Sequence, residues 1–371
     1  MKRDELQDSH LLLLGNQGVG KRSIVREINN KFVNCRNKNF GVEQMGSDYS
    51  ALDFSFLYVK DMMDPEIAES TVTTDDNLPK MNIWSVHDSE RCELIEAVLA
   101  PGQLSRTAAI ICLDFDDPME IMSSLRTWFS ALSKTLLNIV PNMEPGAHEK
   151  MKQRIMRHAQ TYEEPQLDDN GNLIIRREEF KLGDNQDSDM SEEDDVRLDM
   201  PLGEGQLKVN LGIPIMVVCN KIDVIQANGE KAKLLQENLD FIQMHLREYS
   251  LLYGASVVFT ASKPKESKNL DTVYQYLCHR LYNYSFSKQA QVVEKDELFI
   301  PAGFDSLNLI KELCKGQLTG ADGQPLSFED VLRPQFTAMS SSKGYGKAQA
   351  SQQDEVFVES EDWSKLLQIK Y

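Results

Sequence analysis

The chain has 371 residues, a formal net charge of −18 and 41% hydrophobic residues, enough for one large domain or two with a sizeable core. The acidic charge argues against a nucleic-acid-binding surface, which needs clustered Lys and Arg. We find no signal-peptide pattern and no apolar run of about 18 residues, and so expect a soluble cytosolic protein without direct membrane insertion. In that compartment the six scattered cysteines should form no disulfides.

A short apolar run near the start of the chain leads directly into a glycine-rich loop. Leu11–Leu14 predict a strand buried on both faces, and residues 23–32 have the pattern of a helix. Backbone N–H groups in such a loop turn toward phosphate oxygens, and Lys21 adds a full positive charge. The alternative is a tight glycine turn without a ligand. The pattern between strand and helix is G-x-x-x-x-G-K, formed by Gly15, Asn16, Gln17, Gly18, Val19, Gly20 and Lys21.

One position departs from the phosphate-binding pattern. The residue after the lysine should be Ser or Thr, whose hydroxyl would ligate Mg²⁺, but here it is Arg22. Ser23 comes one residue late and would point elsewhere on the helix. Arg22 and Ser23 remain in the candidate nucleotide site, but Arg22 argues against tightly bound Mg²⁺.

The remaining elements alternate between strands and helices. Asp117 is positioned to cap a long helix that begins at Pro118. Continuous apolar strands alternating with helices predict a doubly wound, mostly parallel α/β sheet, whose ligands bind beyond the carboxyl ends of the strands. We expect strands at residues 51–59, 80–86, 107–113, 211–219 and 255–260, and helices at residues 92–99, 118–136, 146–162, 230–252 and 269–282.

Residues 163–208 differ from the rest of the chain. The segment 184–195 alone contains seven acids and no base, and such a tract cannot bury enough apolar surface to offset its chain entropy. We therefore expect a disordered acidic insertion. Ser191, which is followed directly by four acids, is a candidate for phosphorylation by an acid-directed kinase, and an unmodified tract is the alternative.

A second motif follows the strand at residues 211–219. Asn220, Lys221 and Asp223 match the N-K-x-D pattern with which GTPases read guanine, since the carboxylate accepts two N–H groups that adenine does not offer together. Ser262 and Lys263 stand where GTPases carry a loop against the base, although a plain turn would fit as well. These residues predict a guanine nucleotide, GDP in preference to GTP, with an empty site as the alternative.

The parts needed for hydrolysis are missing. GTPases carry Asp-x-x-Gly and then Gln after the third strand, and here Ser85, Asp88 and Ser89 fall at the Asp, Gly and Gln positions. An anionic Asp88 would repel a γ-phosphate. The histidines, His87 among them, have neither a paired nucleophile nor metal-ligand spacing. We therefore expect a GTPase-like fold with no catalytic residues and no metal site.

Four segments carry a close resemblance to a known family: residues 211–223, 241–249, 253–256 and 292–305. They resemble the light intermediate chain of the dynein that serves general cytoplasmic transport. The resemblance implies a degenerate Ras-like domain in a non-catalytic motor subunit, located in the cytoplasm and associated with microtubules. It implies binding to the tail of the dynein heavy chain, contact with other dynein subunits, and coupling of cargo adaptors through a C-terminal segment. The rival interpretations are an active, atypical GTPase of intracellular trafficking and an ATP-using P-loop enzyme, which the guanine motif opposes.

The resemblance also suggests three parts. Residues 1–290 form the Ras-like pseudo-GTPase domain, and residues 291–335 form a family-specific extension whose apolar strip must pack on this domain or on the heavy chain. Residues 336–371 form a polar linker and a short amphipathic segment. Its apolar face could occupy a partner's groove or pack on the domain, and it consists of Phe357, Trp363, Leu366, Leu367 and Ile369.

Overall fold

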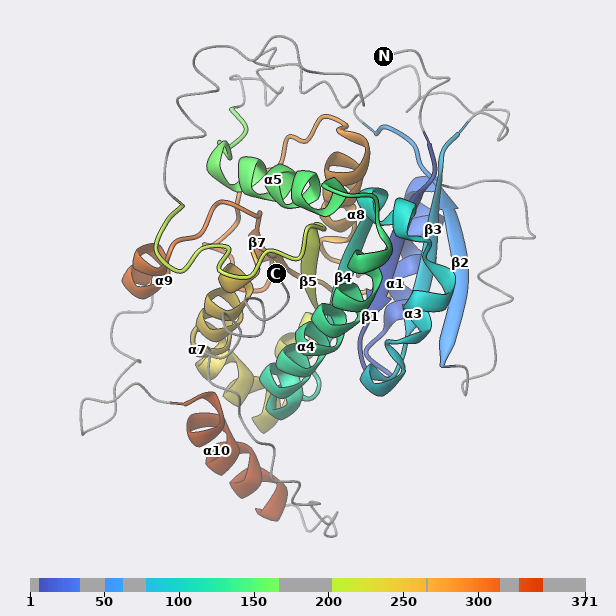
Figure 1. The fold of residues 1–371 in the computed structure, drawn as a ribbon. Coiled ribbons are helices and arrows are strands. Elements are labelled where there is room, and N and C mark those ends of the chain that lie inside the picture. The colour runs from blue at the N-terminus through green and yellow to red at the C-terminus, as the bar shows by residue number, and fades with distance from the viewer. Residues whose placement is uncertain are drawn as a thin grey trace.

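The computed structural model describes residues 7–33, 51–62, 78–166, 202–264, 266–313 and 327–342. In these ranges seven strands form one sheet in the order β2-β3-β1-β4-β5-β6-β7 (Figure 1). The inner strands pair in parallel, whereas β2 and β7 at the two edges run antiparallel to their neighbours. The strands are β1 Ser9–Leu14, β2 Leu52–Tyr58, β3 Lys80–Val86, β4 Thr107–Asp114, β5 Ile215–Asn220, β6 Ser256–Phe259 and β7 Phe299–Ile300.

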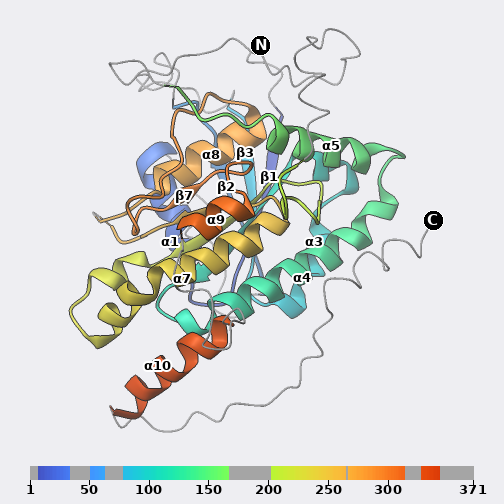
Figure 2. The same cartoon turned by 90° about the vertical axis from the view of Figure 1, so that its left-hand side faces the viewer.

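Helices cover both faces of the sheet, with α1 and α8 on one side and α3 and α4 on the other (Figure 2). The leucines of β1 explain why both faces are covered, because Leu11 and Leu13 join the core under α1 and α8, while Leu12 and Leu14 join the core under α4 and α7. The helices are α1 Lys21–Ile28, α3 Leu94–Val98, α4 Ile121–Ile139, α5 Ala147–Gln160, α7 Glu230–Leu252, α8 Leu270–Tyr282, α9 Leu307–Leu313 and α10 Phe328–Ser342.

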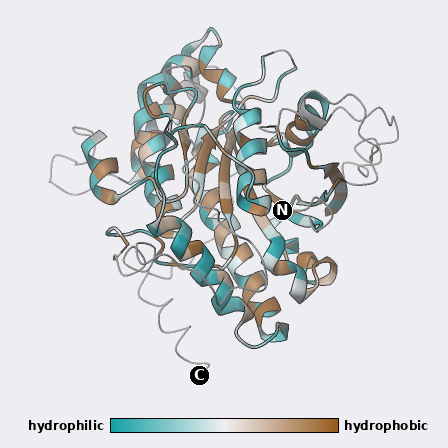
Figure 3. Ribbon diagram, turned by 90° about the horizontal axis from the view of Figure 1, so that it is seen from above, coloured by the Kyte–Doolittle hydropathy of each residue, from teal (hydrophilic) through white to brown (hydrophobic). Residues whose placement is uncertain are grey.

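The hydropathy of the ribbon agrees with this layering. Apolar residues dominate the central strands, while the outer helices alternate between apolar and polar residues (Figure 3). None of the helices in the described ranges combines the length and apolar character that a membrane span requires.

The predicted mostly parallel α/β sheet with helices on both faces is confirmed, with differences at the ends of several helices. Asp117 makes no side-chain capping bond, because a 3-10 turn, Pro118–Glu120, precedes α4. The first helix begins at Lys21 rather than at residue 23, because the glycine loop turns directly into it, and a π-helical turn, Asn29–Val33, follows it. The expected capping by Asp117 is therefore wrong.

The ends of the expected acidic insertion contact the domain where the structure describes them. Leu207 is buried against Ile155 and Ala159 of α5, and the backbone N–H of Ala290 donates to Glu164 at 3.0 Å. The expected disorder therefore does not extend to residues 163–166 and 202–208. The remaining residues of this insertion, Ser191 among them, lie outside the described residues.

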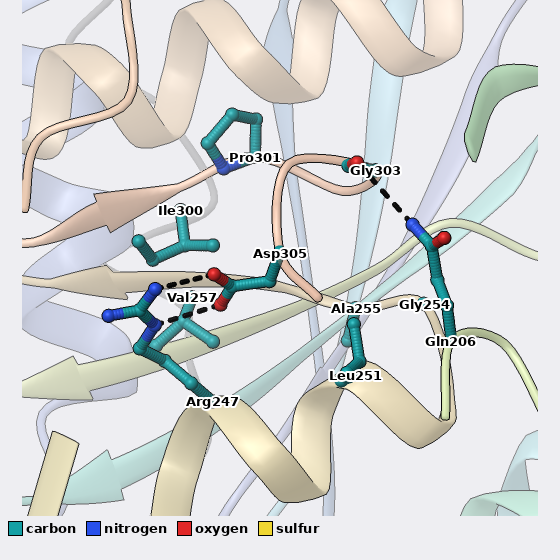
Figure 4. A pocket seen from close by; sticks show the side chains of 10 residues that line it. All are labelled: Gln206, Arg247, Leu251, Gly254, Ala255, Val257, Ile300, Pro301, Gly303 and Asp305. Carbon is teal, nitrogen blue, oxygen red and sulfur yellow. Dashed lines mark hydrogen bonds and ion pairs between the residues drawn. The ribbon is translucent and has the colours of Figure 1, made fainter. Parts of the chain in front are cut away.

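The extension that follows α8 packs against the domain. Its buried residues Phe299 and Ile300 form β7, which pairs with β6 and completes the sheet. A buried ion pair then joins Asp305 to Arg247 of α7 (Figure 4). Neither β7 nor α9 is predicted from the sequence, because a two-residue strand is too short to leave a pattern and Pro301 and Gly303 suggest an irregular segment.

The last described helix, α10, lies against α7 near the carboxyl ends of the strands. Its Phe328 stacks on Phe241 with ring centroids 6.0 Å apart, and its Glu329 pairs with Arg126 of α4 at 2.7 Å. The helix continues to Ser342 and so enters the range expected to be a linker. The amphipathic segment at residues 354–371 lies outside the described residues.

Candidate nucleotide-binding site

The glycine loop connects β1 to α1 with the backbone geometry that only glycine adopts easily. Gly18 and Gly20 have φ angles of +86° and +95°. A Cβ on Gly20 would lie 2.2 Å from Nδ2 of Asn220, so the close approach of these two residues requires a glycine. The loop thus ends at the N-terminus of α1, where backbone N–H groups are available to an anion.

Lys21 is the buried cation of this loop. It is only 3% exposed, and its ammonium donates to the backbone oxygens of Gly15 and, at 2.8 Å, of Asn16. Burial lowers its pKa from 10.5 to about 8. Below pH 8 the charged form therefore costs the fold about 3 kcal/mol, a cost that disappears as the pH rises toward 10.5. A bound phosphate would offset this cost, and two carbonyl bonds leave the ammonium a third N–H to donate.

Asn16 fixes the loop to α4. Its amide nitrogen donates to Ser124 Oγ at 3.0 Å, and its amide oxygen accepts from the indole N–H of Trp128 at 2.9 Å. Trp128 is fully buried, so the loop is attached to a rigid part of the core. Of the other loop residues, Gln17 and Gly18 are exposed, whereas the side chain of Val19 is buried in the core under α1.

Asn220 joins the two predicted motifs. Its amide nitrogen donates to the backbone oxygen of Val19 at 2.9 Å and to Ser262 Oγ at 3.2 Å, and its amide oxygen accepts from the hydroxyl of Thr260. The phosphate-type loop, the end of β5 and the loop after β6 therefore meet at one buried side chain. Asn220 therefore holds these neighbouring loops together.

The charged residues of the second motif are held by ion pairs. Lys221 has a positive φ of 66°, and its ammonium contacts Asp114 at 2.6 Å. Asp223 pairs with Lys263, whose pKa is raised by the hydrogen bond to this carboxylate and by its charge. Asp223 and Ser262 thus lie on adjoining loops at the carboxyl end of the sheet, as the predicted base-reading site requires.

The family model described as dynein light intermediate chain matches residues 6–359. The chain belongs to the dynein light intermediate chain family. It is 31% identical over 326 residues to human cytoplasmic dynein 1 light intermediate chain 1, covering 87% of this chain and 54% of that protein. The chicken protein of the same name is 30% identical over 325 residues, with 87% and 55% covered. The chain thus spans about half the length of the curated relatives it matches.

A solved structure supports the fold of this dynein light intermediate chain homologue. The crystal structure of the dynein light intermediate chain's conserved domain superposes with a TM-score of 0.57 at 18% identity. The match covers 84% of this chain and 87% of that chain. The resemblance read from the sequence is therefore confirmed at the level of the family and of the fold.

A cluster of three side chains next to the glycine loop is not predicted from the sequence. Asp53, at the start of β2, accepts from Arg22 at 2.9 Å and from Nε2 of His87 at 2.9 Å, and both contacts reach the same carboxylate oxygen. No role for His87 follows from its sequence context, and the structure shows it as a partner of Asp53. The sequence contains one indication of this cluster, because Asp53 is an acid within the alternating strand at residues 51–59. Ser23, next to Arg22 on α1, is half-buried.

Ser85 and Asp88, which fall at the hydrolytic positions of GTPases, lie in the sheet and at the start of a turn. Ser85 is fully buried on β3, in register with Asp53 on β2. Asp88 caps a 3-10 turn, Ser89–Arg91, by accepting from the backbone N–H of Glu90 at 3.0 Å. A carboxylate in this capping role is a poor contact for a γ-phosphate, because the two anions would repel each other.

Proposed function

We propose that the chain is a non-catalytic subunit of the cytoplasmic dynein motor. It binds the tail of the dynein heavy chain, contacts other dynein subunits and helps couple cargo adaptors for transport toward microtubule minus ends in the cytoplasm. The observation that carries this proposal is the family match over residues 6–359. The resemblance stated above implies adaptor coupling through a C-terminal segment, and residues 354–371 are the candidate segment in this chain, with packing on the domain as the alternative.

The domain itself binds a guanine nucleotide, GDP in preference to GTP, and does not hydrolyse it efficiently. The buried ammonium of Lys21, the glycine loop and Asp223 supply contacts for two phosphates and a guanine base, and none of them requires a γ-phosphate. Ser85 and Asp88 oppose the rival interpretation as an active GTPase, since Ser85 lacks the carboxylate that would hold the metal ion and the anionic Asp88 would repel a γ-phosphate.

The nucleotide proposal is tested by the content of the purified protein. The chain is purified without added nucleotide and denatured, and the released small molecules are identified by chromatography. We expect GDP at about one molecule per chain. Released GTP would contradict the argument from Asp88, and a folded chain that releases nothing and binds no added GDP would reduce the loop to a glycine turn.

The subunit proposal is tested separately. The chain is mixed with the tail segment of the dynein heavy chain, and complex formation is followed by size-exclusion chromatography. We expect a stable complex whether or not nucleotide is bound. A folded chain that shows no association with the tail would contradict the proposed role.

A further inference from the structure

The residues that should hold Mg²⁺ in a GTPase-like site do not fit that ion here. Mg²⁺ requires oxygen ligands in near-octahedral geometry. The position after the P-loop lysine supplies the guanidinium of Arg22 instead of a hydroxyl, and the end of β3 supplies Ser85 instead of a carboxylate. Across the described ranges no three His, Cys, Asp or Glu side chains gather as a metal site would require.

A carboxylate is nevertheless present, one strand away. Asp53 on β2 is the register partner of Ser85 on β3. The alternation of β2 places Asp53 and Leu57 on the same face of the sheet, and Leu57 packs in the core under α1. The Asp53 side chain is 1% exposed, so its negative charge needs a nearby cation.

That cation belongs to the protein. Arg22, in the first turn of α1, donates to Asp53 Oδ2 at 2.9 Å. His87 reaches the same oxygen, and its pKa is lowered by burial and by the charges of Lys21 and Arg22, so at neutral pH it is uncharged and donates its Nε2–H. Arg22 thus holds a fixed positive charge at the position from which the metal ligand is missing.

We propose that Arg22, fixed by Asp53 and His87, replaces Mg²⁺ in this site, so that a guanine nucleoside diphosphate binds without a metal ion. This inference rests on the nucleotide site proposed above. The replacement of Mg²⁺ by Arg22 also accounts for the proposed preference for GDP over GTP. Lys21, Arg22 and Asp53 together carry one net positive charge, which matches fewer phosphate charges than a site holding Lys21 and a divalent ion would.

The affinity of the full chain for GDP tests this directly. Bound nucleotide is removed, and the dissociation constant for GDP is measured by titration calorimetry in 1 mM EDTA and in 5 mM MgCl₂. We expect the two constants to agree within about twofold, because Arg22 already supplies the charge that Mg²⁺ would provide. A tenfold difference would correspond to about 1.4 kcal/mol of binding free energy. Binding that is tenfold or more tighter with Mg²⁺ would overturn the inference. The absence of GDP binding in both buffers would instead overturn the proposed nucleotide site.

A matched pair of variants tests the role of Arg22. Arg22→Ser removes the cation and leaves Asp53 without it, whereas Arg26→Ser removes an exposed arginine one turn further along the same helix. In EDTA we expect Arg22→Ser to weaken GDP binding at least tenfold and Arg26→Ser to leave it within twofold. Thermal melting confirms that each variant is folded. If folded Arg22→Ser and the unaltered chain bind GDP equally well in EDTA, the assignment is contradicted. If Arg22→Ser does not fold, the comparison of the two buffers on the unaltered chain still tests the inference.

Discussion

Replacing Asp305 by Asn should destabilise the domain strongly, because it breaks the buried ion pair that holds the extension to α7. The guanidinium of Arg247 donates to both carboxylate oxygens of Asp305, with its Nε bond at 2.8 Å (Figure 4). The two side chains are 1% and 6% exposed, so water cannot solvate Arg247 once its partner is neutral.

The size of the effect follows from this burial. Removing one partner of a buried ion pair leaves an uncompensated charge and typically costs about 3–5 kcal/mol. We expect Asp305→Asn to lower the free energy of unfolding by about 3 kcal/mol, the low end of that range, because Asn keeps one acceptor. The double variant Arg247→Met with Asp305→Leu should lose less than Asp305→Asn alone, since it leaves no unpaired charge.

Urea denaturation, followed by tryptophan fluorescence, measures these differences, and Trp128 is a buried reporter in the core. Lys295→Met is the matched control, because the pair of Lys295 and Asp240 has side chains that are 54% and 42% exposed. The control should change the unfolding free energy by less than about 1 kcal/mol. If Asp305→Asn also stays below about 1 kcal/mol, the ion pair does not fix the extension and the reasoning fails.

Three further predictions concern the loop and the base site. GDP affinity should fall about tenfold per pH unit above pH 8, as Lys21 loses its proton, and constant affinity up to pH 10 would contradict its role. Asp223→Ala should lower the guanine nucleotide content while binding to the dynein heavy chain persists, and an unchanged content would argue against this base site. Gly20→Ala should lower the unfolding free energy by about 2 kcal/mol more than Gly146→Ala, because both have positive φ but only Gly20 would place a Cβ against Asn220. Equal losses in urea denaturation would contradict that contact.

The parts of the site that a local pattern encodes could be predicted from the sequence. The four leucines of β1, the glycine spacing and Lys21 lie within a dozen residues, so the strand, the loop and the following helix were evident together. Asn220 was predictable for the same reason, because its motif directly follows a continuous apolar strand.

The cluster around Asp53 could not be predicted in this way. Its three members come from α1, the start of β2 and the end of β3, and they meet only because β2 runs antiparallel to β3 with Asp53 opposite Ser85. Strand direction and register are set by tertiary packing and not by residue spacing. The same limit applies to Asp305, whose partner lies 58 residues earlier in the chain.

The contacts of the site explain why a scaffold is a better proposal than a switch. A GTPase switch needs segments that the γ-phosphate and its metal ion order and that hydrolysis releases. Here Asn220 fastens the loop to β5, Asn16 fastens it to α4, and Arg22 is fastened to β2 through Asp53. The protein's own side chains thus hold the loop and Arg22 in place. A nucleotide bound in such a site would stabilise the domain but would not switch it between two conformations. This fits the proposed role as a non-catalytic motor subunit.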